Sequence, residues 1–177
     1  DILIVDDDDR PVPQGASGEI VSRGRITMPG YWRRDDASDD ARYTDAEGRV
    51  WLRSGDIGHL DDEGFLYIVD RKKDMILSGG QNIYPQDIEA VLIGHPGVDD
   101  VAVIGAPSAR WGETPLALVV PKAGAPAMEE LLAWANERLG RQQRLADCIA
   151  VQALPRNPNG KILKRDLRRE YGDRHYA

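Results

Sequence analysis

The sequence predicts an α+β protein, and three observations point to that class. Short strand-like segments separated by Pro and Gly fill the first part of the chain, up to about residue 69. After residue 73, strand-like and helix-like segments alternate. The chain has 177 residues, of which 41% are hydrophobic, which is enough for one ordinary domain or two small ones. We therefore expect a β-rich first part and a second part in which helices flank a sheet.

The first part is predicted to consist of strands and turns. Strands are expected at residues 2–5 and 19–22, and residues 57–60 and 65–69 are expected to form a hairpin. Its turn ends in Gly64, which can adopt the positive φ that such a turn needs. The polar residues 35–49 are predicted to be a loop with one helical turn.

The second part begins with a helix opened by Pro85, because Pro is favoured in the first turn of a helix. A second helix is expected between Pro126 and Gly140, where apolar residues recur with helical spacing and Gly marks the end. The remaining elements are predicted strands at 101–104, 116–120 and 149–154, and a last helix at about 165–171. We place the boundary between the two parts near residues 70–74.

Charge and cysteine content restrict the classes of function. A net charge of −7 gives no general attraction to nucleic acid or to anionic membranes, so neither is an expected partner. The single cysteine, Cys148, cannot form an internal disulfide, which favours a reducing, cytoplasmic location. No apolar run approaches membrane-spanning length, and no secretory signal is found. Cations for a phosphate-bearing ligand are concentrated near the end of the chain: Lys161, Lys164, Arg165, Arg168 and Arg169.

The acidic runs at residues 6–9 and 39–40 are not expected to bind metal. A calcium loop needs alternating oxygen ligands, a central Gly and a closing Glu, and neither run has that spacing. Solvated turns are the expected structure, and we predict no metal-ligating residues.

Three local patterns could carry chemistry. In the first, Trp51-Leu-Arg-Ser-Gly-Asp56-Ile-Gly58, a carboxylate follows a Ser-Gly turn, where it could accept hydrogen bonds from two ribose hydroxyls. Alternatively, the Asp side chain could accept hydrogen bonds from the backbone of its own turn. For this pattern taken alone, that is the commoner case. The second is Asp70-Arg-Lys-Lys73-Asp-Met-Ile-Leu-Ser78-Gly79-Gly80-Gln-Asn82-Ile-Tyr-Pro85. Its Gly-Gly pair permits close approach of a ligand to the backbone, although a linker and tight turn would use the same residues.

The third pattern is Pro155-Arg-Asn-Pro-Asn159-Gly160-Lys161-Ile-Leu-Lys164-Arg165. Asn-Gly favours a tight turn, which would hold Lys161 at the tip of an exposed loop. The alternative is a solvated lysine in a basic tail. A nucleotide-binding Walker A loop is excluded, because Pro155 and Ile162 occupy the places of its first Gly and its Ser or Thr.

In this order, the patterns resemble the last segment of the adenylate-forming enzymes, which include acyl- and aryl-CoA synthetases, luciferases and peptide-synthetase adenylation domains. The resemblance covers essentially the whole chain and includes Gly18-Glu19-Ile20, Pro29-Gly30-Tyr31-Trp32 and Trp111-Gly112-Glu113. Residues 78–85 are similar to CoA ligases rather than to peptide-synthetase domains. The departures are small: Ser54 replaces a usual Thr, and Gln86-Asp87 replaces a pair that usually ends in Glu.

The resemblance implies the C-terminal portion of an ATP-dependent carboxylic acid–CoA ligase that uses ATP, Mg²⁺ and CoA. Residues 1–73 would be the end of the N-terminal domain, a partial β-barrel subdomain, and residues 74–177 a mobile C-terminal α+β domain. The partners implied are the rest of the N-terminal domain, with its phosphate loop and acid pocket, and a small carboxylic acid. We expect this segment alone to be inactive. The implied site residues are Lys161 for catalysis, Asp56 and Arg71 for the nucleotide, Lys73 as hinge, and Ser78, Gly79 and Gly80 for the CoA channel.

Two alternatives stay open. The parent enzyme could pass its acyl group to a carrier protein instead of CoA, or the chain could be a non-catalytic docking module. The presence of both Lys161 and Asp56 weighs against a decayed module. We also hold the hypothesis that apolar edges in residues 1–69 allow self-association.

Overall fold

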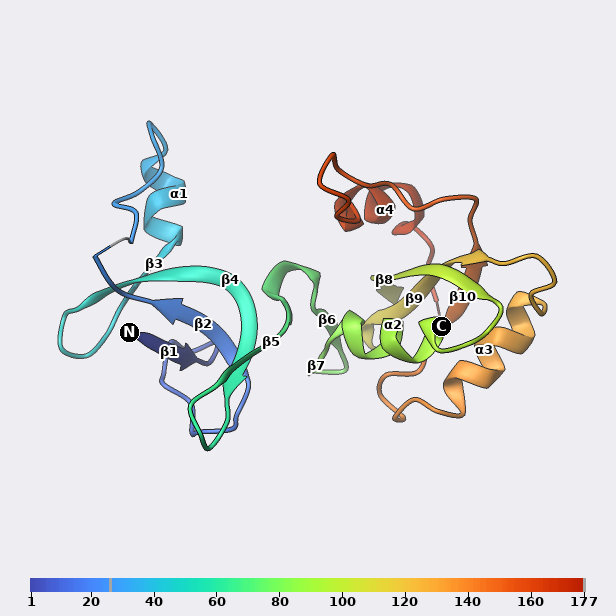
Figure 1. Cartoon of the computed structure of the whole chain (residues 1–177), viewed down its shortest axis with the longest axis horizontal. Helices are drawn as coiled ribbons and strands as arrows, with labels where there is room; N and C mark the ends of the chain where they lie inside the picture. Colours follow the sequence, from blue (N-terminus) through green and yellow to red (C-terminus); the bar gives the residue numbers. More distant parts are fainter. Residues whose placement is uncertain (26, 177) are drawn as a thin grey trace. The chain divides into compact units, whose positions relative to one another are not determined.

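The computed structural model describes residues 1–25 and 27–176 and divides into two compact units (Figure 1). Unit 1 comprises Asp1–Lys73 and unit 2 comprises Asp74–Ala177. Each unit has its own five-stranded sheet, and helices accompany the sheet of unit 2, so the predicted α+β class is confirmed. None of the helices in the described residues is long and apolar enough to cross a membrane.

Unit 1 is a curved antiparallel sheet. Its strands run in the order β1-β2-β4-β3, and β5 also pairs with β4. The register shifts in the β2–β4 pairing and between Ile57 and Gly58 of β4, and such irregularities bend a sheet. Figure 1 shows the resulting bend in β4, which suits part of a barrel. The elements are β1 (Ile2–Val5), β2 (Gly18–Ser22), α1 (Asp35–Asp40), β3 (Arg42–Thr44), β4 (Val50–Leu60) and β5 (Leu66–Arg71).

Most of unit 1 agrees with the sequence prediction, but β3 does not. The strands at 2–5 and 19–22 and the hairpin turn with Gly64 at φ 83° are confirmed. Residues 42–44 were predicted to be loop, yet they pair with β4. Tyr43 is the one apolar residue of β3, so the sequence carries no alternation; the strand is held by packing of Tyr43 with Trp51 in the small core.

The indole N–H of Trp51 in that core is hydrogen-bonded to the carboxylate of Asp45. The carboxylate accepts hydrogen bonds from the indole Nε1 at 2.8 Å and from the Arg49 guanidinium at 2.6 Å. Burial alone would raise the pKa of Asp45, but these hydrogen bonds outweigh it and lower the pKa to about 2. A charged carboxylate therefore closes the loop between β3 and β4.

Unit 2 is built around the long β8–β9 hairpin. β8 pairs antiparallel with β9 from Val98 to Ser108, and β10 adds to β9 in parallel. The sheet order is β10-β9-β6-β7, with β8 also on β9. The elements are β6 (Ile76–Ser78), β7 (Gln81–Ile83), α2 (Pro85–Ile93), β8 (Val98–Ser108), β9 (Gly112–Pro121), α3 (Met128–Asn136), β10 (Asp147–Ala150) and α4 (Lys164–Tyr171), preceded by the 3-10 turn η1 (Lys72–Asp74).

The two faces of the hairpin form two separate apolar cores. Val101 and Val103 face the core that includes residues of α2 and α3, whereas Ala102 and Ile104 face the core that contains Leu167 of α4. This alternation follows from the period of two along a strand. Because both faces are buried, β8 and β9 have almost continuous apolar sequences.

Several boundaries in unit 2 differ from the prediction: β8 and β9 both extend beyond the predicted 101–104 and 116–120. Helix α3 begins after Ala127 rather than at Pro126, and it ends at Asn136, well before Gly140. The side chain of Asn136 explains the early end: it donates to the Leu145 carbonyl and accepts from the Leu145 N–H, at 3.0 and 2.8 Å. Strand β10 ends at Ala150 instead of 154, and the short hairpin of β6 and β7 was not predicted.

Cys148 of β10 provides a test of the unit 2 core. Burial raises the pKa of its thiol to about 12, and the Asp147 carboxylate adds to the shift. Since the thiolate is the reactive form, we expect iodoacetamide at pH 8 to label the native chain at least ~10³-fold more slowly than the chain in guanidinium. Mass spectrometry would measure both rates at this single cysteine. Equal rates in the two conditions would contradict the buried placement.

Candidate functional site

In unit 1, the structure brings Asp56 and Arg71 together. They are direct cross-strand partners on β4 and β5, and the Arg71 Nε lies 2.6 Å from Asp56 Oδ1. The two side chains are 23% and 43% exposed, so the pair remains accessible to a ligand. The Ser54 hydroxyl accepts a hydrogen bond from the Asp56 N–H at 3.0 Å and donates to the Ile20 carbonyl at 2.8 Å. This turn therefore fixes the backbone that carries the carboxylate.

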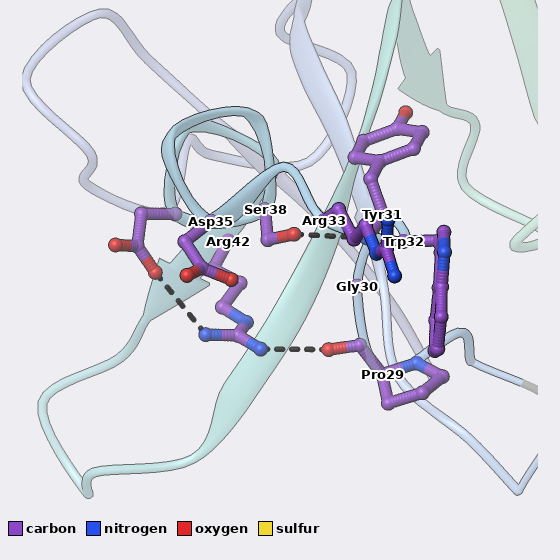
Figure 2. A pocket seen from close by; sticks show the side chains of 9 residues that line it. Pro29, Gly30, Tyr31, Trp32, Arg33, Asp35, Ser38 and Arg42 are labelled. Atoms are coloured by element: carbon purple, nitrogen blue, oxygen red, sulfur yellow. Dashed lines mark hydrogen bonds and ion pairs between the residues drawn. The ribbon is translucent and has the colours of Figure 1, made fainter.

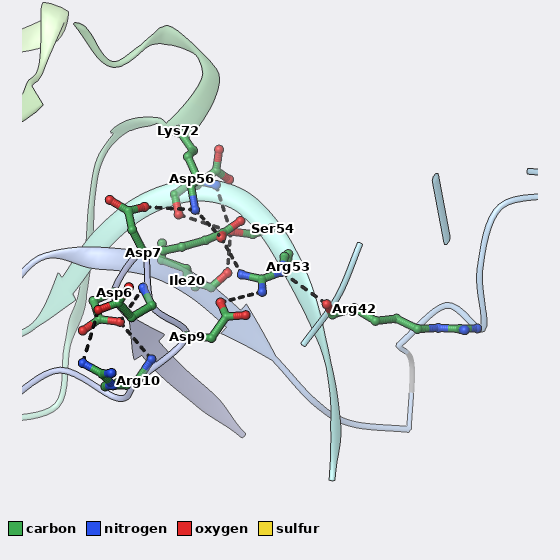
Figure 3. A network of polar contacts seen from close by, with 12 residues as sticks. Asp6, Asp7, Asp9, Arg10, Ile20, Arg42, Arg53, Ser54, Asp56 and Lys72 are labelled. Carbon is green, nitrogen blue, oxygen red and sulfur yellow. Dashed lines mark hydrogen bonds and ion pairs between the residues drawn. The ribbon is translucent and has the colours of Figure 1, made fainter. Parts of the chain in front are cut away.

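The acidic loop 6–9 takes part in a network of ion pairs around Glu19, and Figure 3 shows Asp7, Asp9, Arg53 and Lys72 of this network. Glu19 is buried, and its Oε2 lies 2.9 Å from Arg53 and 3.1 Å from Lys72. Arg53 also binds Asp9 at 2.6 Å, and Lys72 lies 3.3 Å from Asp7. Residues 7–9 form an exposed turn, as expected, and Asp7 and Asp9 also form ion pairs, which the sequence did not predict. No group of three or more metal-ligating side chains occurs in the part of the chain described.

The residues on either side of Lys73 are anchored to different units. Lys72 is bound by the Glu19 network of unit 1. Asp74 is buried in unit 2, where its carboxylate lies 3.0 Å from Nη1 of Arg168 and its carbonyl accepts a second hydrogen bond from that guanidinium. Lys73 itself is exposed, and its ammonium has no partner among the described residues.

In unit 2, the Gly79-Gly80 pair forms the turn between β6 and β7. Both residues have positive φ, 57° and 79°, as two-residue hairpin turns require. A Cβ on Gly79 would lie 2.9 Å from the Trp111 ring, whereas a Cβ on Gly80 would meet nothing within 4 Å. The Gly79 N–H also donates to the Trp111 carbonyl at 2.8 Å. The turn is therefore held against Trp111.

The rest of the Trp111-Gly112-Glu113 motif supports the same hairpin. Glu113 accepts the Leu77 N–H at 2.9 Å, and Gly112 pairs with Ser78. A pocket of about 170 Å³ opens beside the turn, and it is lined by Ser78, Gly79, Trp111, Arg141 and Gln142. The predicted channel residues Ser78 and Gly79 thus lie together with Trp111 of the Trp111-Gly112-Glu113 motif and with a cation, Arg141, that the sequence did not single out.

Lys161 lies on a compact, exposed loop. The Asn157 side chain accepts the N–H groups of Asn159 and Lys161 at 3.0 and 2.9 Å, and Gly160 has a φ of 80°. The Asn157 N–H donates to the Lys161 carbonyl at 2.9 Å. The Lys161 ammonium forms no ion pair or hydrogen bond with any described residue. A cation on an ordered turn is thus left available for a ligand.

The neighbouring cations differ from Lys161. Lys164 lies 2.8 Å from Glu89, and Arg168 binds Asp74. Arg165 and Arg169 are 92% and 82% exposed and have only distant contacts with Asp166. Two of the five cations predicted to serve a ligand therefore hold α4 to the rest of unit 2.

The Pro29–Trp32 motif of unit 1 lies beside an open pocket of about 560 Å³ (Figure 2). The buried Ser38 hydroxyl accepts the Tyr31 N–H at 2.8 Å, and Arg42 donates to the Pro29 carbonyl at 2.6 Å. Tyr31 and Trp32 are 51% and 86% exposed. This pocket was not predicted from the sequence.

Comparison with known proteins agrees with these features. Residues 87–161 match the profile of the AMP-binding enzyme C-terminal domain. These residues belong to that family. The resemblance inferred from the motifs is therefore confirmed for the segment that contains the Lys161 loop.

Longer proteins resemble the whole chain around this AMP-binding C-terminal domain. The chain is 45% identical over 164 residues to the long-chain-fatty-acid–CoA ligase FadD13 of Mycobacterium tuberculosis, covering 93% of this chain and 32% of that protein. The structure of ATP-bound MatB from Rhodopseudomonas palustris matches with a TM-score of 0.88 and 32% identity, over 98% of this chain and 34% of MatB. The amide bond synthetase McbA from Marinactinospora thermotolerans matches with a TM-score of 0.82 and 35% identity, over 97% and 34%. The chain thus spans about a third of the length of these relatives.

The Gly79 contact gives a prediction for the hairpin. Gly79→Ala and Gly80→Ala both place an alanine at positive φ, which costs about 1–2 kcal/mol, but Gly79→Ala must also displace the Trp111 ring. We expect urea denaturation to show the larger loss of stability for Gly79→Ala. The difference should shrink when both are made in a Trp111→Ala background. Equal losses in the original background would contradict the contact.

Proposed function

We propose that this chain is the C-terminal portion of an ATP-dependent carboxylic acid–CoA ligase. The observation that carries the proposal is the Lys161 loop, which presents an unpaired ammonium on an ordered turn within the AMP-binding C-terminal domain. The similarity to a long-chain-fatty-acid–CoA ligase over 93% of the chain supports CoA as the acceptor. The acid itself would be selected by residues outside this segment.

The proposed reaction has two steps. In the first, a carboxylate oxygen of the acid attacks the α-phosphorus of ATP, the bond to the β-phosphate breaks, and pyrophosphate leaves. In the second, the sulfur of CoA, having lost its proton, attacks the acyl carbon of the adenylate, and AMP leaves with the electrons of the broken bond. Magnesium would enter with the ATP phosphates, and we place the enzyme in the cytoplasm.

Lys161 would act in the first step. Two anions must approach each other there, and negative charge grows on the phosphoryl oxygens as the new bond forms. A positioned cation offsets that charge, and losing one such group costs roughly 10²–10³-fold in rate. The four-carbon stem of lysine suits this role, because the ammonium can follow the charge as it moves.

Asp56 and Arg71 would bind the nucleotide. Arg71 occupies Oδ1 of Asp56, so Oδ2 remains available to accept a ribose hydroxyl. Arg71 would add positive charge beside the nucleotide.

Lys73 would be the hinge about which unit 2 turns between the two steps. Lys72 is anchored in unit 1 and Asp74 in unit 2, so a backbone change concentrated at Lys73 would disturb neither ion-paired anchor. Hinges are a few residues that absorb such a change. Ser78, Gly79 and Gly80 would then border the channel for the CoA arm, where the absence of side chains at the turn leaves room.

A second acceptor class is supported by McbA, an amide bond synthetase. A parent enzyme of that kind would transfer the acyl group to an amine, and a related variant would load a carrier protein. Supplying CoA, an amine or a carrier protein to the preformed acyl-adenylate separates these possibilities by product mass.

The main test is Lys161→Ala in the enzyme that carries this segment. We expect acid-dependent exchange between ATP and pyrophosphate to fall by about 10²–10³-fold, because the cation at the forming bond is lost. Thioester formation from supplied acyl-adenylate should continue at the original rate. Both rates would be followed by mass spectrometry or radiolabel.

Two outcomes would contradict this role. An equal loss of rate in both steps would show that Lys161 does not act specifically in the first step. No loss of rate in either step would favour a non-catalytic module. The 177-residue chain alone, given ATP, magnesium, CoA and mixed acids, is the control and should form no acyl-CoA.

We also propose that the isolated chain self-associates through β5. This strand pairs with β4 alone among the described strands, and Phe65, Tyr67 and Ile68 are 61%, 50% and 62% exposed. An exposed apolar edge strand favours pairing with another copy. Sedimentation velocity should show a concentration-dependent dimer that Ile68→Lys abolishes and Ile93→Lys, on α2, does not. A monomer at high concentration would rule this out.

A further inference from the structure

Arg156, a side chain that the motifs did not single out, attaches the Lys161 loop to the body of unit 2 by polar contacts. The hydrogen bonds of Asn157 and Gly160 order the turn internally, but they lie within the loop and do not fix its direction. Outside the loop, Ile162 packs against the core that contains Leu167, and Arg156 supplies a directional polar attachment. Its Nη1 donates to the Gly160 carbonyl at 2.6 Å, and its Nη2 lies 2.6 Å from Oδ2 of Asp100.

The other end of this bridge, Asp100, is anchored in the sheet. Asp100 lies in β8 opposite Val120 of β9, and its Oδ1 accepts the Val101 N–H at 3.0 Å. The carboxylate is thus held by its own strand while it binds the guanidinium. The donors of a planar guanidinium have a fixed relative geometry, so a guanidinium that binds two acceptors also fixes their relative orientation. An ammonium, whose donors rotate freely, attracts an acceptor without fixing its orientation.

The bridge also decides which cation on the loop can meet an anion. Arg156 is 44% exposed, but its charge is matched by Asp100, and its two terminal nitrogens are both occupied. The Lys161 ammonium has no such partner within the described residues. Arg156 therefore acts on the loop and leaves the ligand to Lys161.

We propose that Arg156, together with Asp100, is a positioning residue that aims Lys161 for adenylate formation. This inference rests on the function proposed for Lys161. Catalytic groups must be held to within a fraction of an ångström, and a misplacement of about 1 Å costs on the order of 10²-fold in rate. Gly160, which precedes Lys161 directly, is the residue whose carbonyl Arg156 holds, so loss of the bridge releases Lys161 at its own backbone.

The first part of the test is structural and needs only the 177-residue chain. Arg156→Gln and Asp100→Asn should each increase fast backbone motion at Gly160 and Lys161, measured by ¹⁵N relaxation, and Arg156→Lys should restore order only partly. Arg165→Gln is the matched control, since Arg165 is 92% exposed near the same loop. The melting temperature reports whether each variant folds. A folded Arg156→Gln chain whose loop is as ordered as the original would overturn the proposal.

The second part uses the enzyme that carries this segment. Arg156→Gln should slow acid-dependent ATP–pyrophosphate exchange by about 10–100-fold and leave thioester formation from supplied acyl-adenylate unchanged. The double variant with Asp100→Asn should be no worse than either single variant, because both break one bridge. General misfolding would slow both steps.

The two hypotheses fail in different ways. If Lys161→Ala leaves ATP–pyrophosphate exchange unchanged, the function proposed for Lys161 is wrong, and the Arg156–Asp100 bridge has no catalytic role. If Lys161→Ala abolishes exchange while Arg156→Gln loosens the loop without slowing exchange, the function stands and the positioning role is overturned.

Discussion

The register of the β8–β9 hairpin is the constraint on which unit 2 depends. Val103 and Ala117 pair across the ladder and face one core, while the neighbouring pair Ile104 and Leu116 faces the other. A slip of one residue would exchange the two faces, because side chains alternate along a strand. It would also move Asp100 away from Arg156. The same register therefore determines both the packing of the helices and the support of the Lys161 loop.

Several charged side chains attach one element of the fold to another. The Glu19 network holds the loop 6–9 and the residue before Lys73, and Lys164 joins α4 to Glu89 of α2. Glu89 also accepts the Val103 N–H at 2.7 Å. Exposed ion pairs contribute little to stability, but these are partly buried and share hydrogen bonds with the backbone, so they fix geometry. The fold can in this way keep a short loop in one orientation without burying it.

The sequence predicted elements that carry their own local signal and missed those stabilised by distant contacts. Pro85 opens α2 as expected, because the fixed φ of Pro acts locally. The early end of α3 depends on the hydrogen bonds between Asn136 and Leu145, which no local pattern reveals. Likewise, the position of Lys161 on an Asn-Gly turn could be predicted, whereas its attachment to Asp100, 61 positions earlier, could not. Long-range side-chain contacts are what single-sequence patterns lack.

The pairing of charges around Lys161 indicates that an anion would be bound by the orientation of this one side chain and not by a generally positive surface. The chain carries −7 overall, and charges farther than about 8 Å are largely screened at physiological ionic strength. Near the loop, Arg156 is matched by Asp100 and Lys164 by Glu89. A surface that attracted anions by charge density would have left these cations unpaired. Instead, Arg156 holds the backbone of the loop and Lys164 holds α4, so on the loop itself the Lys161 ammonium is the cation left to meet a phosphate among the described residues.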